Sequence, residues 1–109
     1  MCIRDSPKLF PKGFNDSAND VHKFLSSIIK TTGDLACSFK PQVAYFSALG
    51  LEDVLQTLIS EIHRDFPGVP VILDAKRGDI GSTAEMYARE AFERYKADAV
   101  AVNPYICLL

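Results

Sequence analysis

The sequence has few cysteines, no excess of either charge and no long apolar run. Its three cysteines, Cys2, Cys37 and Cys107, lie far apart and form no CxxC pair, which argues against a disulfide framework or a zinc site and favours a reducing cytoplasm. Its 12 Lys and Arg against 14 Asp and Glu leave a net charge of −2, whereas a general nucleic-acid binder needs a basic surface. No apolar run approaches the ~18 residues of a membrane span, and the first residues lack the apolar core of a secretory signal. We therefore expect a cytoplasmic protein without a metal, a nucleic-acid partner or a membrane partner.

The remaining composition is that of one small globular domain. The 109 residues are 48% hydrophobic and 24% charged, which excludes disordered and collagen-like classes. A chain of this length forms one domain.

Three segments carry apolar residues at the spacing of a half-buried helix. The first begins at Ser17 and ends at Gly33, the second starts near Leu51, and the third starts at Ser82. Ser17 and Ser82 each open a capping box, and Gly33 stands where a helix is usually capped. The side chains predicted for the inner face of the third helix are Ala84, Ala88, Ala91, Phe92 and Tyr95. His22 and His63 occupy polar positions, where we expect both to be solvated.

Short, mostly apolar runs at residues 35–41, 69–74 and 99–104 follow the three helical segments as predicted strands. The strand ends are about 30 residues apart, the length of a parallel βαβ unit. The sequence therefore predicts an α/β fold with a parallel sheet.

A charged motif follows the most apolar of these strands. Asp74 and Lys76 are two residues apart and so share one face of a strand, and Asp79 lies in the loop beyond. Lys40 closes the preceding strand. Because ligands bind at the carboxyl ends of parallel strands, we expect these two cations and two carboxylates to alternate within a few ångströms.

This cluster has a chemical interpretation and a structural one. Lysines would keep a neighbouring carboxylate ionised, so that it could repel a negative group on a substrate. The ammonium of Lys76 could stabilise a developing carbanion and then protonate it. The same residues could instead form a plain salt-bridge network. Ser82 and Thr83, near a helix start, could bind an anion or simply cap the helix.

Three segments resemble orotidine 5′-phosphate decarboxylase in its longer bacterial form. The most specific is VILDAKRGDIGSTAEMYA at 71–88, and CSFKPQVAYFSALG at 37–50 and AVAVNPY at 99–105 match the adjacent segments in order. The resemblance implies a (β/α)8 TIM barrel, of which this chain would hold about helices 1–3 and strands 2–4. It also implies a homodimer with active sites at the interface, and decarboxylation of orotidine 5′-monophosphate to UMP without metal or cofactor.

The resemblance also implies a role for each matching residue. Lys76 would protonate C6 after carbon dioxide leaves, Asp74 would lie near the substrate carboxylate, and Lys40 would complete the array and contact the ribose. Asp79 would reach into the partner subunit's site, accompanied by Ile80 and Thr83, which would line the base pocket and contact the ribose side.

The chain also departs from the family pattern. Only Asp5 stands in the region of the substrate-binding Asp of the first strand, and the later strands with the phosphate-gripping Gln and Arg are missing. We therefore interpret residues 1–109 as a single partial domain, the N-terminal part of a decarboxylase barrel. Residues 1–6 and 106–109 are candidate non-native ends, and we expect the chain to be inactive alone.

Two alternatives remain open from the sequence. The chain could be a non-catalytic α/β fragment or interaction chain, in which the motif is only an ion-pair network. It could also come from a related sugar-phosphate decarboxylase, because D-x-K-x-x-D is shared across that wider suprafamily. Such an enzyme would act through a metal-stabilised enediolate.

Overall fold

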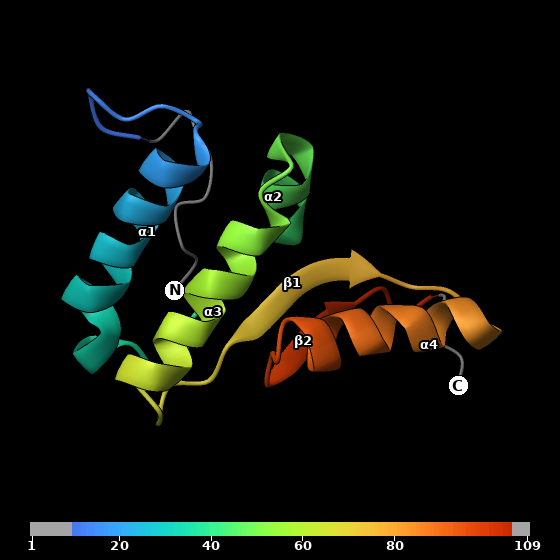
Figure 1. The fold of residues 1–109 in the computed structure, drawn as a ribbon. Helices are drawn as coiled ribbons and strands as arrows, with labels where there is room; N and C mark the ends of the chain where they lie inside the picture. The colour runs from blue at the N-terminus through green and yellow to red at the C-terminus, as the bar shows by residue number, and fades with distance from the viewer. Residues whose placement is uncertain (1–9, 106–109) are drawn as a thin grey trace.

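A computed structural model describes residues 10–105 of the chain. The expectations for residues 1–6 and 106–109, including the role of Asp5, fall outside this range. The elements, in chain order, are α1 Ala18–Thr32, the 3-10 turn η2 Gly33–Leu35, α2 Val43–Leu49, α3 Glu52–Asp65, β1 Ile72–Arg77, α4 Gly81–Arg89, the π-helical turn η3 Glu90–Arg94, and β2 Ala99–Val102 (Figure 1).

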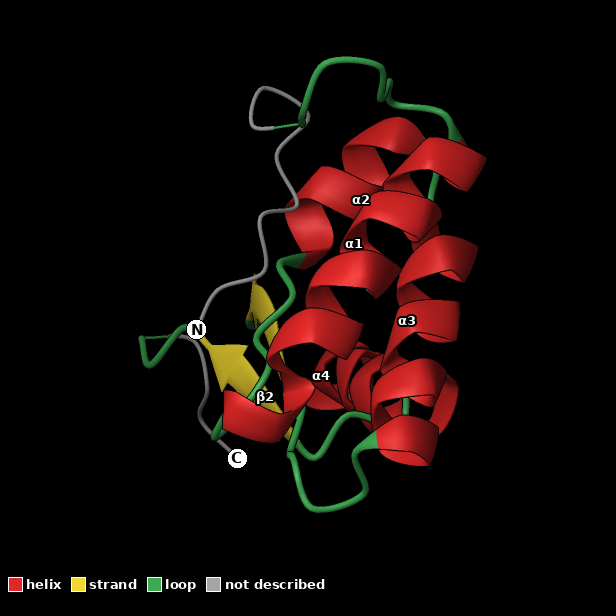
Figure 2. Ribbon diagram, turned by 90° about the vertical axis from the view of Figure 1, so that its left-hand side faces the viewer, coloured by secondary structure: helices red, strands yellow, loops and turns green. Residues whose placement is uncertain are grey.

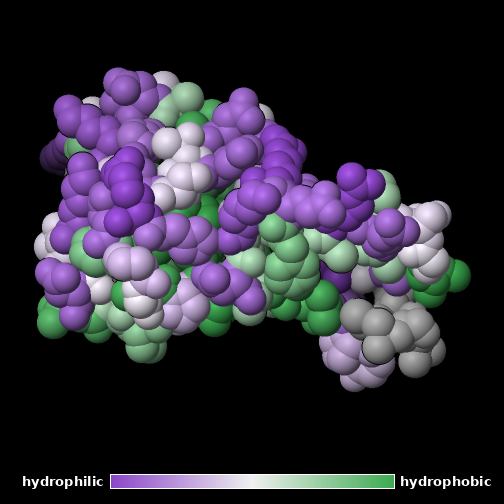
Figure 3. All heavy atoms as spheres, turned by 60° about the horizontal axis from the view of Figure 1, so that its bottom comes forward, coloured by the Kyte–Doolittle hydropathy of each residue, from purple (hydrophilic) through white to green (hydrophobic). Residues whose placement is uncertain are grey.

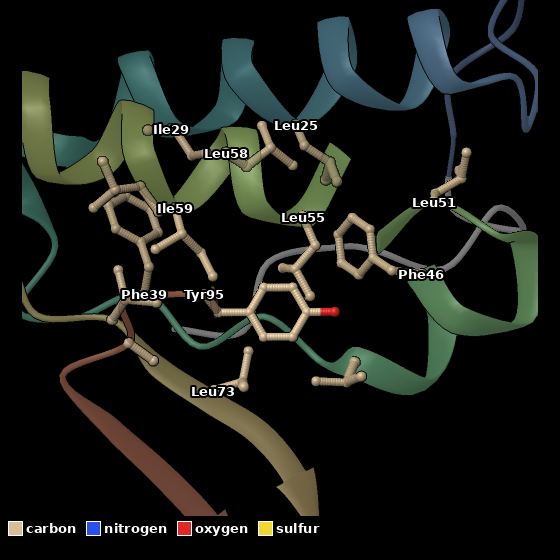
Figure 4. Close-up of a cluster of buried hydrophobic side chains, with 14 of the residues drawn as sticks. Leu25, Ile29, Phe39, Phe46, Leu51, Leu55, Leu58, Ile59, Leu73 and Tyr95 are labelled. Carbon is tan, nitrogen blue, oxygen red and sulfur yellow. The ribbon is translucent and has the colours of Figure 1, made fainter. Parts of the chain in front are cut away.

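Helices α1 and α3 pack side by side through their apolar faces. As predicted, α1 begins after Ser17, whose hydroxyl accepts a hydrogen bond from the Asp20 N–H (3.3 Å). The apolar stripes of both helices are buried, with Leu25, Leu55 and Ile59 fully inaccessible (Figure 4). Each such side chain contributes about 1.5–3 kcal/mol relative to an exposed one, so these stripes hold the helical layer together.

Gly33 ends α1 as predicted, but for a different reason. Its φ of −57° is right-handed, so no left-handed cap requires glycine there. A Cβ at this position would lie 2.3 Å from Cζ of Phe66, which follows the last residue of α3. Glycine is therefore needed because the Phe66 ring packs directly on the backbone.

The sheet is parallel and follows the chain order. β1 pairs with β2 in the register Ile72↔Ala99 to Asp74↔Ala101. Two isolated parallel bridges, Phe39↔Val71 and Gln42↔Asp74, add a third row on the other side of β1. Figure 2 shows α1, α2 and α3 on one side of the strands, which is the layering expected of a β/α barrel.

The predicted strand at 35–41 is wrong in its extent. Its first residue, Leu35, belongs to the 3-10 turn and is 89% exposed, whereas Phe39 is fully buried. Pro41 has no N–H to donate, so the segment adds only short bridges. The next helix, α2, begins directly after Gln42 without a side-chain cap and was not predicted.

The third helix also differs from the prediction. It begins at Gly81, with a φ of +58°, and the N-cap residue before it, Ile80, makes no side-chain capping hydrogen bond. Ser82 therefore lies inside the first turn and does not cap it. Of the predicted inner face only Ala91 and Tyr95 are buried, and Phe92 is 45% exposed.

The exposed part of the predicted inner face borders a groove. It has a volume of about 360 Å³ and lies between α4 and the two strands. No described residue fills it, and apolar side chains reach the surface of this part of the molecule (Figure 3). Its apolar lining includes Leu73, Ala75, Ala84, Ala88, Val100 and Val102.

Both histidines are partly solvated, with side chains 34% and 33% exposed, but each also has an acidic partner that was not predicted. Nε2 of His22 lies 2.8 Å from Oε1 of Glu61, a contact between α1 and α3. Nε2 of His63 lies 3.0 Å from Oδ2 of Asp98, which also accepts the N–H of Val71. Their partners are 35 or more residues away, so local patterning could not reveal them.

Within residues 10–105 there is no helix with the length and apolar character needed to span a bilayer.

Candidate active site

The charged motif lies near the carboxyl end of β1, beside the bridge row. The N–H of Asp74 donates to the Pro41 carbonyl (2.9 Å). This pairing places Lys40, one residue earlier, beside the Asp74 side chain. The Lys40 and Lys76 ammonium groups both contact the Asp74 carboxylate, which confirms the predicted juxtaposition of these three side chains.

Each carboxylate oxygen of Asp74 contacts one lysine. Nζ of Lys76 lies 2.5 Å from Oδ1, and Nζ of Lys40 lies 3.2 Å from Oδ2. The Asp74 side chain is only 6% exposed, whereas those of Lys40 and Lys76 are 37% and 64% exposed. A nearly buried carboxylate is thus shared by two partly solvated ammonium groups.

The electrostatics favour an ionised carboxylate. The hydrogen bond from Lys76 lowers the pKa of Asp74, burial opposes this, and the hydrogen bond from Lys40 lowers the pKa again. The net direction is downward, because two adjacent cations outweigh the desolvation of one partly buried anion. Asp74 therefore holds a fixed negative charge at neutral pH.

The fourth predicted member, Asp79, does not join the cluster. Its Oδ1 accepts the N–H of Ile80 (2.8 Å), and it takes part in none of the ion pairs among residues 10–105. The expected alternation of four charges is wrong within this chain. Ile80 is 67% exposed and Thr83 is also exposed, so these side chains remain free to contact another surface.

Sequence reasoning missed one group beside the site. The guanidinium of Arg77 pairs with Glu90 and lies 5.1 Å from the centroid of the Tyr87 ring. Arg77 and Glu90 are 13 residues apart, so their pairing depends on how the helix after the loop folds back. The one sequence signal for this group was Arg77 itself, which follows Lys76 directly within the charged motif.

The site combines positively and negatively charged side chains, and the described residues around it do not form a set of metal ligands. Within residues 10–105 no group of three or more His, Cys, Asp and Glu side chains is placed to hold a metal. A fixed anion beside a lysine ammonium can destabilise a bound negative group and donate a proton to the atom that loses it. These are the requirements of a decarboxylation through a carbanion.

Parallel strands that follow the chain order, with helices α1, α2 and α3 on one side (Figure 2), form part of a β/α barrel, and sites in that class of fold lie at the carboxyl ends of the strands. The family model described as orotidine 5′-phosphate decarboxylase / HUMPS family matches residues 17–107. The chain belongs to this family, whose orotidine decarboxylases are carboxy-lyases.

Named relatives agree with this assignment. The orotidine 5′-phosphate decarboxylase of Dechloromonas aromatica is 59% identical over 100 residues, covering 92% of this chain and 37% of that protein. The solved orotidine monophosphate decarboxylase of Leishmania donovani is 35% identical with a TM-score of 0.73, over 95% of this chain and 39% of that one. The Leishmania donovani UMP synthase structure is 33% identical with a TM-score of 0.79, over 96% and 22%. The chain thus spans well under half the length of these relatives.

Proposed function

We propose that this chain forms the N-terminal part of an orotidine 5′-monophosphate decarboxylase, as a single partial domain. The observation that carries the proposal is the Asp74 carboxylate, nearly buried and shared by Lys40 and Lys76. The names of the similar proteins supply the substrate, because the charged cluster alone defines only the reaction type.

The proposed reaction uses charge and one proton transfer. Asp74 lies near the substrate carboxylate and destabilises it by repulsion. The bond between C6 and the carboxylate carbon breaks, carbon dioxide leaves, and the electron pair remains on C6. The ammonium of Lys76 stabilises this carbanion and transfers a proton to C6, which yields UMP. Lys40 keeps Asp74 ionised and contacts the ribose.

We further propose that the complete enzyme is a cytoplasmic homodimer with shared sites. The exposed Ile80 and Thr83 support this, because neither is covered within the described part of the chain. Asp79 would reach the partner subunit's site together with them, lining the base pocket and contacting the ribose side.

A chimera tests the proposed function. The matching 100-residue segment of the Dechloromonas aromatica relative is replaced by the segment of this chain, and carbon dioxide release from orotidine 5′-monophosphate is measured. We expect an active chimera that loses at least ~100-fold in kcat with Lys76→Ala, the scale of lost proton transfer. Lys23→Ala, on the exposed side of α1, is the matched control and retains full activity.

Two results would contradict the proposal. A Lys76→Ala chimera that keeps its rate would leave the cluster as a structural ion-pair network. Turnover by the purified 109-residue chain alone would show that residues outside it are not required.

The sugar-phosphate alternative has a separate test. A decarboxylase that works through a metal-stabilised enediolate loses activity when a chelator removes its metal. We expect the chimera to keep its rate in excess chelator, and a metal-dependent loss would favour the alternative.

A further inference from the structure

The backbone at Lys76 is strained. Its φ of 49° places a non-glycine residue in the left-handed region, a conformation that persists only when its surroundings hold it. The ladder with β2 also shifts here, from Asp74↔Ala101 directly to Arg77↔Val102. Ala75 and Lys76 therefore form a bulge, and a bulge of this kind re-aims a side chain.

The residue after the bulge is held by two contacts. The Arg77 guanidinium pairs with Glu90 and lies over the Tyr87 ring, 5.1 Å from its centroid. The Arg77 and Glu90 side chains are only 31% and 23% exposed. A planar guanidinium that pairs and stacks at the same time is fixed in both position and orientation.

Glu90 is itself fixed by the helix that carries it. At this residue the helix changes from α4 to the π-helical turn η3, and the N–H of Tyr95 donates to the Glu90 carbonyl (3.1 Å). Ala91 and Tyr95 of this region are buried, so the core determines the register of the turn.

We propose that Arg77 is a positioning residue. Through Glu90 and Tyr87 it anchors the far side of the bulge, and this holds the Lys76 ammonium on the Asp74 carboxylate. Its catalytic consequence depends on the proposed decarboxylase function, but the positioning itself is measurable in this chain without turnover.

The primary test is a Glu90→Leu variant of the 109-residue chain, with the Asp74 carboxyl titrated by carbon-13 NMR. If Arg77 positions Lys76, its release loosens the Lys76–Asp74 hydrogen bond, and the pKa of Asp74 rises by ~0.5 unit or more. Direct electrostatics predicts the opposite sign, because removing the negative charge of Glu90 would lower that pKa. The sign of the shift therefore separates the two explanations.

Two further variants complete the test. Glu93→Leu removes the same charge from the same turn, but Glu93 pairs with the exposed Arg89, so we expect no rise. Tyr87→Leu changes no charge, and we expect a rise in the pKa of Asp74 because the stacking contact is lost. If Glu90→Leu does not fold, Tyr87→Leu decides the question. An unchanged or lowered pKa of Asp74 in whichever of Glu90→Leu and Tyr87→Leu folds would overturn the proposal.

Activity in the chimera separates this inference from the proposed function. Arg77→Leu is expected to lower kcat at least tenfold with little change in KM, because substrate contacts remain while the proton donor is misplaced. An inactive parent chimera together with the NMR shift would refute the function and keep the positioning role. An active parent whose Arg77→Leu variant keeps its kcat would refute the positioning role alone.

Discussion

Replacing Tyr95 by phenylalanine should stabilise the protein. The Tyr95 side chain is 1% exposed, and its hydroxyl has no hydrogen-bond partner among residues 10–105. Figure 4 shows the ring between Leu55 and Leu73, in the centre of the core. A buried hydroxyl without a partner loses its hydration and gains nothing in return.

The magnitude follows from this environment. An unsatisfied buried polar group costs about 1–3 kcal/mol, and the void left by one oxygen atom offsets part of the gain. We expect Tyr95→Phe to raise the free energy of unfolding by ~1 kcal/mol, or the midpoint of thermal unfolding by roughly 4 °C.

Urea unfolding followed by circular dichroism measures this change. The midpoint should rise while the slope m stays constant, because both proteins expose the same surface. Tyr105→Phe is the control, since that side chain is 90% exposed and its replacement should change nothing. A Tyr95→Phe variant that is less stable than the parent by ~1 kcal/mol would show that the hydroxyl has a partner, and would refute the reasoning.

Alkaline pH gives a second readout on the same residue. Burial raises the pKa of Tyr95, so the folded state keeps its phenolic proton where the unfolded chain, with a pKa of about 10, begins to lose it. The contribution of Tyr95 to stability is therefore fully present below about pH 10 and is lost as the pH rises through the higher folded value. Tyr95→Phe should remove this part of the alkaline loss.

Three further predictions concern other parts of the fold. The pKa of Asp74 is lowered in the folded protein. The resulting stabilisation is present above about pH 4 and is lost as the pH falls through the folded pKa, so Asp74→Asn should reduce the fall of the urea midpoint at acid pH. Gly33→Ala should lower the free energy of unfolding by ~1–3 kcal/mol through its clash with Phe66, and Phe66→Leu should relieve most of that loss in a double-mutant cycle. Asp98→Ala should destabilise by ~1 kcal/mol or more, because the N–H of Val71 loses its acceptor, and an unchanged urea midpoint would contradict this.

The sequence by itself determined the pair of helices α1 and α3 and the residues at the centre of the site. The stripes of α1 and α3, with the Ser17 cap, are local signals, because 3.6-residue periodicity gathers Leu25, Leu55 and Ile59 on buried faces whatever their partners are. The proximity of Asp74 and Lys76 was also predicted from their two-residue spacing, but the bulge at Ala75 and Lys76 interrupts the regular alternation there.

Only the tertiary structure decided the features that depend on distant partners. The pairs His22–Glu61 and Arg77–Glu90 join separate elements, and no local spacing encodes them. The same holds for the bridge row at Phe39, whose strand character depends on the edge of β1. Propensity and periodicity report how a segment meets its immediate neighbours, whereas ion pairs, bulges and short bridges form only where packing brings separate segments together.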